Sequence, residues 1–234
     1  LLCVMLLVAG CATTATKPAV LSGPVSPVSP APPPPPPPKR ADFENQPSSG
    51  DTQHVADWVV DSGDSHGMPF MIIDKTYATV YMFEPEGHLL AEAPCLIGLT
   101  KGDVCDPGIG REKLSQMVPS QRITPAGRFV ASLGPDLKGK IVLWVDYNGG
   151  LGLHWVATGN PKEHRLERIA SPNPADHRIS YGCINVPNSF YQDVVKPTFT
   201  GKKGVVYILP EVQSNSETFK SYYRVELKGK SATR

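Results

Sequence analysis

A cysteine that directly follows a glycine stands out in the stretch HRISYGCINVP, residues 177–187. A thiol becomes a strong nucleophile when a neighbouring base takes its proton. Gly182 allows the chain to turn tightly before Cys183, and successive backbone N–H groups in such a turn can stabilise an oxyanion. Residues 180–183 therefore indicate a nucleophile with an anion-binding loop, whereas an isolated cysteine is usually a small core residue.

Three histidines lie close enough in the sequence to serve as the base: His154, His164 and His177. His177 is nearest to Cys183, but a catalytic pair must be held at about 3 Å by rigid elements. His154 lies in the alternating run LGLHWV, which is typical of a strand, whereas His164 and His177 lie in a charged, proline-containing segment where histidines are usually solvated. We therefore predict that His154 is the base.

The remaining cysteines divide into two pairs. Cys3 and Cys11 lie in the apolar start of the chain, and Cys95 and Cys105 flank the loop LIGLTKGDV. An odd number of cysteines in the folded domain of an exported protein indicates a free thiol or an intermolecular bond, and cysteines as close in sequence as Cys95 and Cys105 can bridge in an oxidising compartment. We expect a Cys95–Cys105 disulfide, which leaves Cys183 free; the alternative is that both are free and half-buried.

From about residue 54 the sequence predicts a mainly β domain with a few short helices. We expect two strands and a hairpin turn at 84–88 within MPFMIIDKTYATVYMFEPEGHLL, and further strands in GRFVASLG, GKIVLWVDYNGGLGLHWVA and KGVVYILPE. Short helices are expected in PKEHRLERIA and in NSFYQDVVK, with Asn188 or Ser189 as the cap of the second. Residues 222–227 could add a last strand.

The first 53 residues differ from the rest in composition. Residues 1–8 form an apolar run that is too short to span a bilayer, which needs roughly 20 residues, but fits the core of a signal peptide whose start is missing. We interpret residues 1–11 as this signal peptide and residues 12–53, which include seven consecutive prolines, as an extended, disordered linker. A ligand for an SH3-type domain is the alternative for the prolines. The catalytic domain then spans 54–212, with a C-terminal extension at 213–234.

The signal peptide ends in VAGC, residues 8–11, which resembles the bacterial lipobox. In that motif small residues let a signal peptidase cut before a cysteine that carries lipid, so Cys11 is the expected lipidation site. Ala12 rather than Asp follows, which by resemblance to Gram-negative lipoproteins implies a periplasmic protein anchored to the outer membrane. The alternative is a plain signal peptide with a chance cysteine.

Two other classes of function receive little support from the sequence. Lys and Arg number 23 and Asp and Glu 22, so the net charge of +1 gives no electrostatic reason to expect a nucleic-acid partner. His154, His164, His177 and Cys183 could ligate a metal, but their spacing is not compact. We expect neither a metal nor a cofactor.

Several segments together resemble the L,D-transpeptidase catalytic domain, the YkuD-type family. SYGCIN resembles its S-x-G-C-[IV]-[RN] signature, ITPAGRF its T-P-x-G-x-F segment, and GLGLHWV the strand that carries its catalytic histidine. MIIDKTYATVYMFEPEGHL resembles the opening hairpin and GVVYILP the closing strand, so the match covers most of residues 68–210 in the family's order. Three features depart from the family: Trp155 follows the histidine in place of glycine, Asn185 stands where many members carry arginine, and residues 158–176 lengthen the gap between His154 and Cys183 as an expected lid or side wall.

The resemblance implies a β-sandwich enzyme that acts on the tetrapeptide stems of peptidoglycan without a metal. Cys183 would attack the carbonyl of the third residue, usually meso-diaminopimelate, and expel the terminal D-alanine, while His154 takes the thiol proton. The N–H groups of Tyr181, Gly182 and Cys183 are the expected oxyanion donors, and Ser180 is expected to hold the loop in shape. Asn185, Arg178 and Trp155 are expected to contact the substrate.

The acyl acceptor stays open at this point. A stem amine would give a cross-link, the lysine of a lipoprotein would give protein anchoring, and water would give L,D-carboxypeptidase activity. An amidase-type hydrolase of the same fold and an inactive peptidoglycan-binding lipoprotein are further alternatives. The intact pair of Cys183 and His154 argues against the inactive form.

Overall fold

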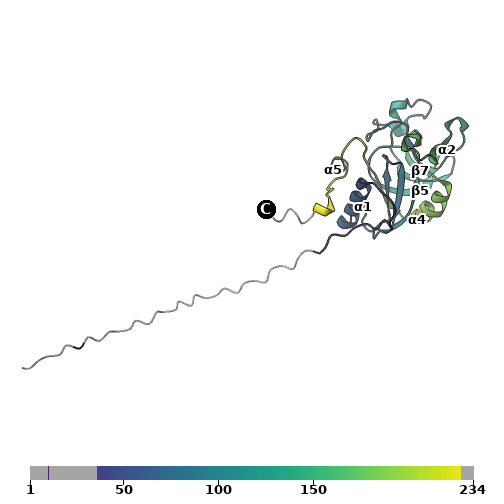
Figure 1. Cartoon of the computed structure of the whole chain (residues 1–234). Helices are drawn as coiled ribbons and strands as arrows, with labels where there is room; N and C mark the ends of the chain where they lie inside the picture. The colour runs from purple at the N-terminus through teal and green to yellow at the C-terminus, as the bar shows by residue number, and fades with distance from the viewer. Residues whose placement is uncertain (1–9, 11–35, 228–234) are drawn as a thin grey trace, which may run out of the picture. The chain divides into compact units, whose positions relative to one another are not determined.

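The protein is described by a computed structural model that covers residue 10 and residues 36–227 (Figure 1). The fold is mainly β with short helices, as the sequence predicts. The strands are β1 (Phe70–Asp74), β2 (Thr79–Phe83), β3 (Leu89–Pro94), β4 (Ile97–Gly98), β5 (Gly127–Pro135), β6 (Ile141–Asp146), β7 (Leu151–Trp155), β8 (Arg178–Ser180), β9 (Ile184–Val186) and β10 (Gly204–Ile208). The α-helices are α1 (Gly50–Ser62), α2 (Arg165–Ile169), α3 (Asn188–Phe190), α4 (Lys196–Phe199) and α5 (Asn215–Thr218). A π-helical turn, η5 (Tyr191–Val195), joins α3 to α4, and 3-10 turns are η1 (Ile109–Arg111), η2 (Pro119–Gln121), η3 (Pro161–Glu163), η4 (Pro174–His177) and η6 (Val225–Leu227).

Eight strands form one sheet in the order β3-β2-β1-β10-β5-β6-β7-β9, while β4 and β8 pair with each other. The pairs β1–β10, β7–β9 and β4–β8 are parallel, and the other neighbours are antiparallel. The predicted turn at 84–88 connects β2 to β3. The sheet ends in β9, which is the strand that follows Cys183 directly.

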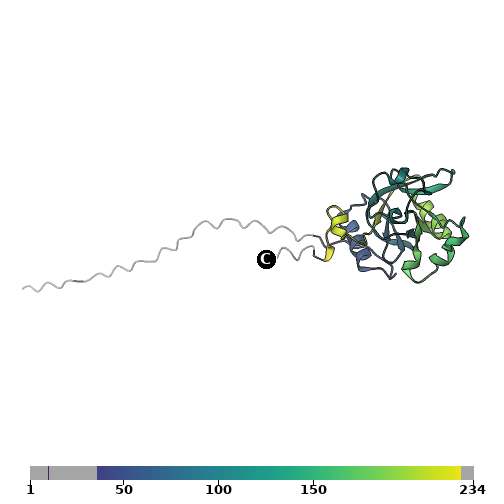
Figure 2. The same cartoon turned by 90° about the horizontal axis from the view of Figure 1, so that it is seen from above.

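Each face of the sheet carries its own hydrophobic core because apolar residues alternate along the strands. Residues such as Met71, Leu153 and Ile184 pack against the helical segment α3–α4. The opposite face, with Phe70 and Tyr207, packs against α1 and the C-terminal segment. Figure 1 shows α1 and α5 on one side of the sheet and α4 on the other, and the turned view in Figure 2 agrees.

Helix α1 corrects the predicted start of the folded domain. Residues 12–53 were expected to be a disordered linker, but α1 begins at Gly50 with Ser49 as its N-cap, where the Ser49 side chain accepts from the N–H of Thr52. The buried side chains Thr52, Val55, Ala56 and Val59 recur at helical spacing. Upstream, Arg40 forms an ion pair with Asp57 at 2.6 Å, so packing extends to about residue 40.

The C-terminal extension also packs onto the domain, as far as Val225. Phe219 stacks on Trp58 with ring centroids 5.9 Å apart, and Val225 is fully buried in the same core. The strand expected at 222–227 is instead the 3-10 turn η6 (Val225–Leu227). This segment has no neighbouring strand to pair with, because it lies against α1 rather than at a sheet edge.

The two predicted helices are present. NSFYQDVVK forms the continuous helical run α3–η5–α4, although Pro187 rather than Asn188 or Ser189 occupies the N-cap position. PKEHRLERIA is divided into η3 and α2, because His164 adopts a left-handed backbone conformation with φ of 49° between them.

No helix within the described residues is long and apolar enough to cross a membrane. The expected lipidation site Cys11, the signal peptide apart from Gly10, and the proline-rich stretch as far as residue 35 lie outside the described residues.

Candidate active site

Strands β7 and β9 place the predicted nucleophile and base on the same face of the sheet. The two strands pair in parallel, with Leu153 opposite Ile184 and His154 opposite Asn185. Leu153 and Ile184 are fully buried in the core on one face. Because side chains alternate along a strand, His154, Asn185 and, two residues earlier, Cys183 lie on the opposite face.

The imidazole of His154 is held in one tautomer. Its Nδ1 lies 2.7 Å from the carbonyl oxygen of Trp155, and its Nε2 lies 3.2 Å from the Asn185 side-chain nitrogen. A carbonyl oxygen can only accept and an amide nitrogen can only donate, so Nδ1 carries the proton and the Nε2 lone pair accepts from the Asn185 NH₂. Burial lowers the pKa of His154, the Trp155 carbonyl opposes this effect, and the charge of Arg165 adds to it.

The thiol of Cys183 lies at the start of β9 and contacts backbone groups of β7. Its Sγ lies 3.7 Å from the carbonyl oxygen of Gly150, and the N–H of Gly152 also bonds to the sulfur. Burial raises the pKa of the thiol, against opposing effects from the Gly152 N–H and the charge of Arg165. Within the described residues no hydrogen bond joins Cys183 to His154. Catalytic hydrogen bonds often tighten only when substrate is bound.

A pocket of about 470 Å³ opens beside Cys183. Its walls are segment 103–126, the turn before β7, and residues 181–183. The carboxylates of Asp106, Glu112 and Asp146 line it, and its described lining includes no lysine, arginine or histidine. The pocket therefore suits a substrate that carries a positively charged group.

The loop before Cys183 is held by two hydrogen bonds. The Ser180 hydroxyl oxygen accepts from the Gly182 N–H at 3.0 Å, and the Gly182 carbonyl oxygen accepts from the Thr124 hydroxyl at 2.6 Å. Ser180 thus shapes the loop as expected. The Gly182 N–H is thus engaged by Ser180, whereas the described residues supply no hydrogen-bond partner for the N–H groups of Tyr181 and Cys183. The oxyanion role of this loop stays a prediction, and the Tyr181 and Cys183 N–H groups are its unengaged donors.

Gly182 itself is required by the geometry of this loop. Its φ is +127°, and a Cβ there would lie 2.8 Å from the carbonyl oxygen of Ile123. We expect Gly182→Ala to lower the free energy of unfolding by about 1–3 kcal/mol and to reduce the reactivity of Cys183, because the backbone must shift. Denaturant unfolding and alkylation rates measure both effects. Gly159→Ala is the matched control, since a Cβ at Gly159 meets nothing within 4 Å; equal effects in the two variants would contradict the assignment.

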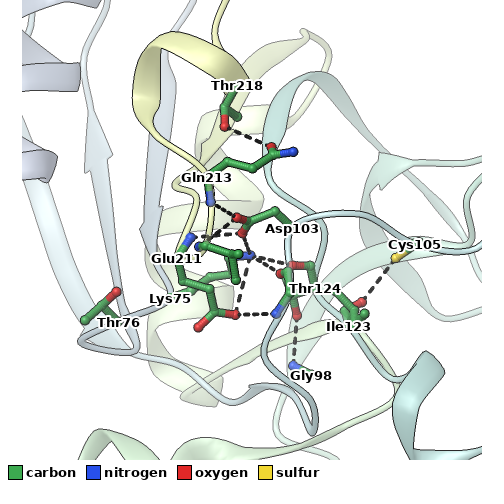
Figure 3. Close-up of polar contacts among 12 residues, drawn as sticks. Lys75, Thr76, Gly98, Asp103, Cys105, Ile123, Thr124, Glu211, Gln213 and Thr218 are labelled. Carbon is green, nitrogen blue, oxygen red and sulfur yellow. Dashed lines mark hydrogen bonds and ion pairs between the residues drawn. The ribbon is translucent and has the colours of Figure 1, made fainter.

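A buried ion-pair network around Lys75 includes Asp103, which lines the pocket; Figure 3 shows the contacts of this network. The Lys75 ammonium donates to Asp103 Oδ1 at 2.7 Å, to the Gly102 carbonyl at 2.5 Å and to the Thr124 carbonyl at 2.9 Å, and Glu211 Oε1 lies 3.6 Å away. Burial lowers the pKa of Lys75, against the opposing effects of Asp103 and Glu211. Burial alone would raise the pKa of Asp103, but hydrogen bonds from Lys75 and from the N–H groups of residues 211–213 hold it below its usual value.

This network connects the end of β1 to the nucleophile loop. Lys75 binds the Thr124 backbone, and the Thr124 hydroxyl in turn accepts from the Gly98 N–H at 2.8 Å while it donates to Gly182. Segment 98–124 is thereby anchored beside Cys183 at both of its ends. The sequence offered no signal for this role, because a lysine after a strand is normally exposed.

Arg178 and Trp155, which the resemblance predicts to contact the substrate, both make contacts within the protein. The Arg178 guanidinium pairs with Glu211 and donates to the carbonyl oxygens of Lys75 and Gly98, so we assign it a structural role. Trp155 packs edge-on against Tyr191 with ring centroids 5.3 Å apart, on the core side of β7. Alternation along the strand turns it to the face opposite His154.

The two other histidines have different surroundings. His164 is exposed and pairs with Glu167 at 2.7 Å, as expected for a solvated residue. His177 is buried, which corrects the expectation that it is solvated: its ring nitrogens lie 3.0 Å from the Cys95 carbonyl and 2.9 Å from the Ser171 carbonyl. His177 thus ties the inserted segment to the end of β3. Among the described residues no group of three or more His, Cys, Asp and Glu is arranged to hold a metal.

Cys95 and Cys105 are free, which corrects the expected disulfide. Cys95 is fully buried in the core beside Ile97, whereas the Cys105 sulfur lies at the pocket wall, 3.4 Å from the carbonyl oxygen of Ile123. The loop that separates them leads out of the core, so the two sulfurs have different surroundings. Burial raises the pKa of both thiols.

This arrangement predicts the pattern of thiol modification. Without reductant, the native domain should react with iodoacetamide at Cys183 and, more slowly, at Cys105, because both line the pocket. Cys95 should react only after unfolding, because its side chain is fully buried. Peptide mapping by mass spectrometry checks this order. A peptide in which Cys95 is bridged to Cys105 would contradict it.

An aromatic pair beside the nucleophile was not identified from the sequence. Trp144 lies opposite Gly152 in the β6–β7 pairing, and Tyr147 packs edge-on against it with ring centroids 5.1 Å apart. Since side chains alternate along paired strands, Trp144 and Cys183 lie on the same side of the sheet. The bulge between Trp144 and Asp146 that brings Tyr147 over the ring could not be located in the sequence.

Comparison with known proteins gave structural likenesses only: no family model matches the chain, and no curated protein does. The helical cell shape determining protein Pgp2 from Campylobacter jejuni aligns with a TM-score of 0.40 and 16% identity over 68% of this chain and 55% of that one. An L,D-transpeptidase from Mycobacterium smegmatis aligns at 0.34 and 16% over 60% of this chain and 58% of that one. The catalytic domain of an Enterococcus faecium L,D-transpeptidase aligns at 0.33 and 16% over 61% of this chain and 98% of that one. This chain thus spans little more than half the length of the first two, and its resemblance to the L,D-transpeptidase catalytic domain rests on the motifs around Cys183 and His154.

Proposed function

We propose that this chain is a cysteine-dependent L,D-transpeptidase that acts on peptidoglycan tetrapeptide stems through an acyl-enzyme on Cys183. One observation carries the proposal. Cys183, within the SYGCIN motif, borders a pocket of about 470 Å³ and shares a sheet face with His154. The Nε2 atom of His154 carries a lone pair and no proton. A thiol and a base that are positioned by adjacent strands can perform nucleophilic acyl transfer.

The resting pair is a thiol with a neutral imidazole. Burial raises the pKa of Cys183 and lowers that of His154, so both groups are uncharged near neutral pH. His154 therefore acts as a general base during the attack rather than as the imidazolium partner of a preformed thiolate. The N–H groups of Tyr181 and Cys183 are the proposed donors to the oxyanion that forms.

Acyl transfer proceeds in two halves, which share the thioester on Cys183. The sulfur of Cys183 forms a bond to the carbonyl carbon of the third stem residue, and its proton passes to Nε2 of His154, where it replaces the hydrogen bond from the Asn185 NH₂. The bond to the terminal D-alanine nitrogen then breaks, and the imidazolium returns the proton to that amine as it leaves. In the second half an acceptor amine or water attacks the thioester, and Cys183 recovers its proton through His154.

The acidic lining of the pocket supports a cationic stem residue. Asp106, Glu112 and Asp146 lie within the same wall as Cys183. The side-chain amine of meso-diaminopimelate, the usual third residue for this family, carries such a charge. A stem with a neutral third residue should accordingly be a poorer substrate, because it leaves these carboxylates uncompensated.

The test uses purified disaccharide-tetrapeptide with the domain comprising residues 37–234. Mass spectrometry should show loss of D-alanine, as a cross-linked dimer if a stem amine is the acceptor and as a tripeptide if water is. Cys183→Ser should abolish both products while keeping the unfolding curve of the parent. Turnover of the stem by Cys183→Ser, or none by the parent protein, would overturn the proposal.

We further propose that Cys11 carries the lipid anchor and that the protein lies in the periplasm. The VAGC sequence after an apolar run supports this placement. In cells, Cys11→Ala should move the protein from the outer-membrane fraction to the soluble periplasmic fraction. Unchanged membrane fractionation of this variant would contradict the anchor.

A further inference from the structure

The inserted segment 158–176 brings one arginine to the base. Arg165 begins α2, and its side chain is 10% exposed. Its Nε donates to Glu163 Oε2 at 2.5 Å, and its Nη1 donates to the side-chain oxygen of Asn185. The Arg165 guanidinium is largely buried, forms an ion pair with Glu163 and donates to Asn185 next to His154. Each of these contacts limits the freedom of the side chain, so its position is fixed.

Arg165 determines which way the amide of Asn185 points. A guanidinium has only donors, so the Asn185 oxygen must face Arg165 and the Asn185 NH₂ must face His154 Nε2. The backbone of Asn185 is held as well, since it exchanges two hydrogen bonds with Leu96 at 2.7 and 2.9 Å. The amide can therefore turn over only if it loses its bond to Arg165.

These contacts determine which ring nitrogen of His154 carries the proton. An NH₂ group that faces Nε2 requires a lone pair there, and the Trp155 carbonyl requires the proton on Nδ1. An imidazolium would place an Nε2–H against the Asn185 NH₂, two donors facing each other. The arrangement thus favours the neutral form that a general base needs.

We propose that Arg165 is a positioning residue that, through Asn185, keeps His154 neutral with its lone pair on Nε2. The role rests on the proposed function, because it prepares the base for the Cys183 thiol. It also gives the inserted segment a function: α2 carries the arginine into place, and His177 ties the segment to Cys95.

Other groups around His154 do not account for the same effect. The charges that act on it are Arg165 from α2, and Asp136 and Lys140 from the β5–β6 hairpin. Asp136 favours the imidazolium and Lys140 opposes it, so these two act against each other. Cys183, on the same face as His154, is an uncharged thiol near neutral pH because burial raises its pKa.

The experiment compares the parent domain with Arg165→Met, Arg165→Lys and the control Arg168→Ala. Arg168 lies on the same helix and donates to the carbonyl oxygens of Glu163 and Asp176, but it makes no contact with Asn185. The first readout is the ¹⁵N NMR titration of the His154 ring, which reports tautomer and pKa without any substrate. The second is the pH profile of Cys183 alkylation by iodoacetamide.

In the parent protein the His154 ring should titrate as an Nδ1–H tautomer. Arg165→Met should raise the pKa of His154, mix its tautomers and lower the alkylation rate at neutral pH by about tenfold or more, as expected when the group that orients a catalytic histidine is lost. Arg165→Lys keeps the positive charge but loses the two-nitrogen geometry of the guanidinium. Its His154 pKa, tautomer ratio and alkylation rate should lie between those of the parent and Arg165→Met. Arg168→Ala should leave the His154 titration unchanged, whatever its effect on stability.

Two results would overturn the proposal: an unchanged His154 titration in both Arg165 variants, or an equal shift in Arg168→Ala. If Arg165→Met fails to fold, Arg165→Lys tests the proposal by itself, because loss of the guanidinium geometry alone must alter the tautomer ratio of His154. A normal His154 response together with no turnover of peptidoglycan stems would contradict the proposed function and leave the role of Arg165 standing.

Discussion

In His154→Ala, the rate at which a substrate acylates Cys183 at neutral pH should fall by about 10²- to 10⁴-fold, the usual contribution of a general base. The reason is the protonation state of the pair. Burial raises the pKa of the Cys183 thiol, so few molecules hold a thiolate that could react without a base. Stopped-flow acylation of the parent and the variant measures the ratio.

The pH dependence of the same reaction has a defined sign. A general base must be unprotonated, and burial lowers the pKa of His154, so the acylation rate should stay high through neutral pH and fall only below the ordinary range of imidazole. In His154→Ala this acid limb should disappear, and the residual rate should rise steadily with pH as thiolate forms.

His164→Ala is the control for this prediction, because His164 is exposed and pairs only with Glu167 in the same segment. Its rate and pH profile should match those of the parent. Full acylation in His154→Ala, or a loss in His164→Ala of similar size, would remove His154 from the proposed role.

Lys75→Met should lower the free energy of unfolding by about 3–5 kcal/mol, the usual cost of removing one partner of a buried ion pair. The change leaves the Asp103 carboxylate and the carbonyl oxygens of Gly102 and Thr124 without their shared donor. Asp103 keeps three backbone N–H donors, from residues 211–213, and these limit the loss. Guanidinium unfolding followed by tryptophan fluorescence gives the value.

Lys101→Met is the control, because it removes the same charge from a lysine that lies outside the buried network. Lys101 is exposed in the same segment and should change stability by no more than about 0.5 kcal/mol. Lys75→Met should also slow alkylation of Cys183, because Thr124 positions the carbonyl of Gly182. A loss below about 1 kcal/mol in Lys75→Met would show that the network does not hold the pocket wall.

The strands and the position of His154 could be predicted because local pattern determines them. LGLHWV alternates, and β7 places Leu153 in the core and His154 on the opposite face. The motif SYGCIN likewise marked Ser180 and Gly182, which are joined by a hydrogen bond of 3.0 Å. Helix α1 escaped detection because it follows a proline-rich stretch, although Ser49 and the spacing of its apolar residues are a recognisable start signal.

The remaining features of the site depend on contacts between distant segments. Lys75 meets Asp103 and Glu211 only once β1, the 98–124 segment and the end of β10 have come together. Asn185 is in contact with Arg165 only because the inserted segment folds back over β9. The prediction of a Cys95–Cys105 bridge was wrong for the same reason. Closeness in sequence did not show that the Cys95 sulfur lies in the core while the Cys105 sulfur lies at the pocket.

The most direct test of the acyl-enzyme is the intact mass of the domain after incubation with a carbapenem, a class of β-lactam that acylates many L,D-transpeptidases. Cys105→Ser is included because Cys105 borders the same pocket. The account predicts one adduct per chain in the parent and in Cys105→Ser, and none in Cys183→Ser. An adduct that persists in Cys183→Ser, or that disappears in Cys105→Ser, would contradict Cys183 as the nucleophile.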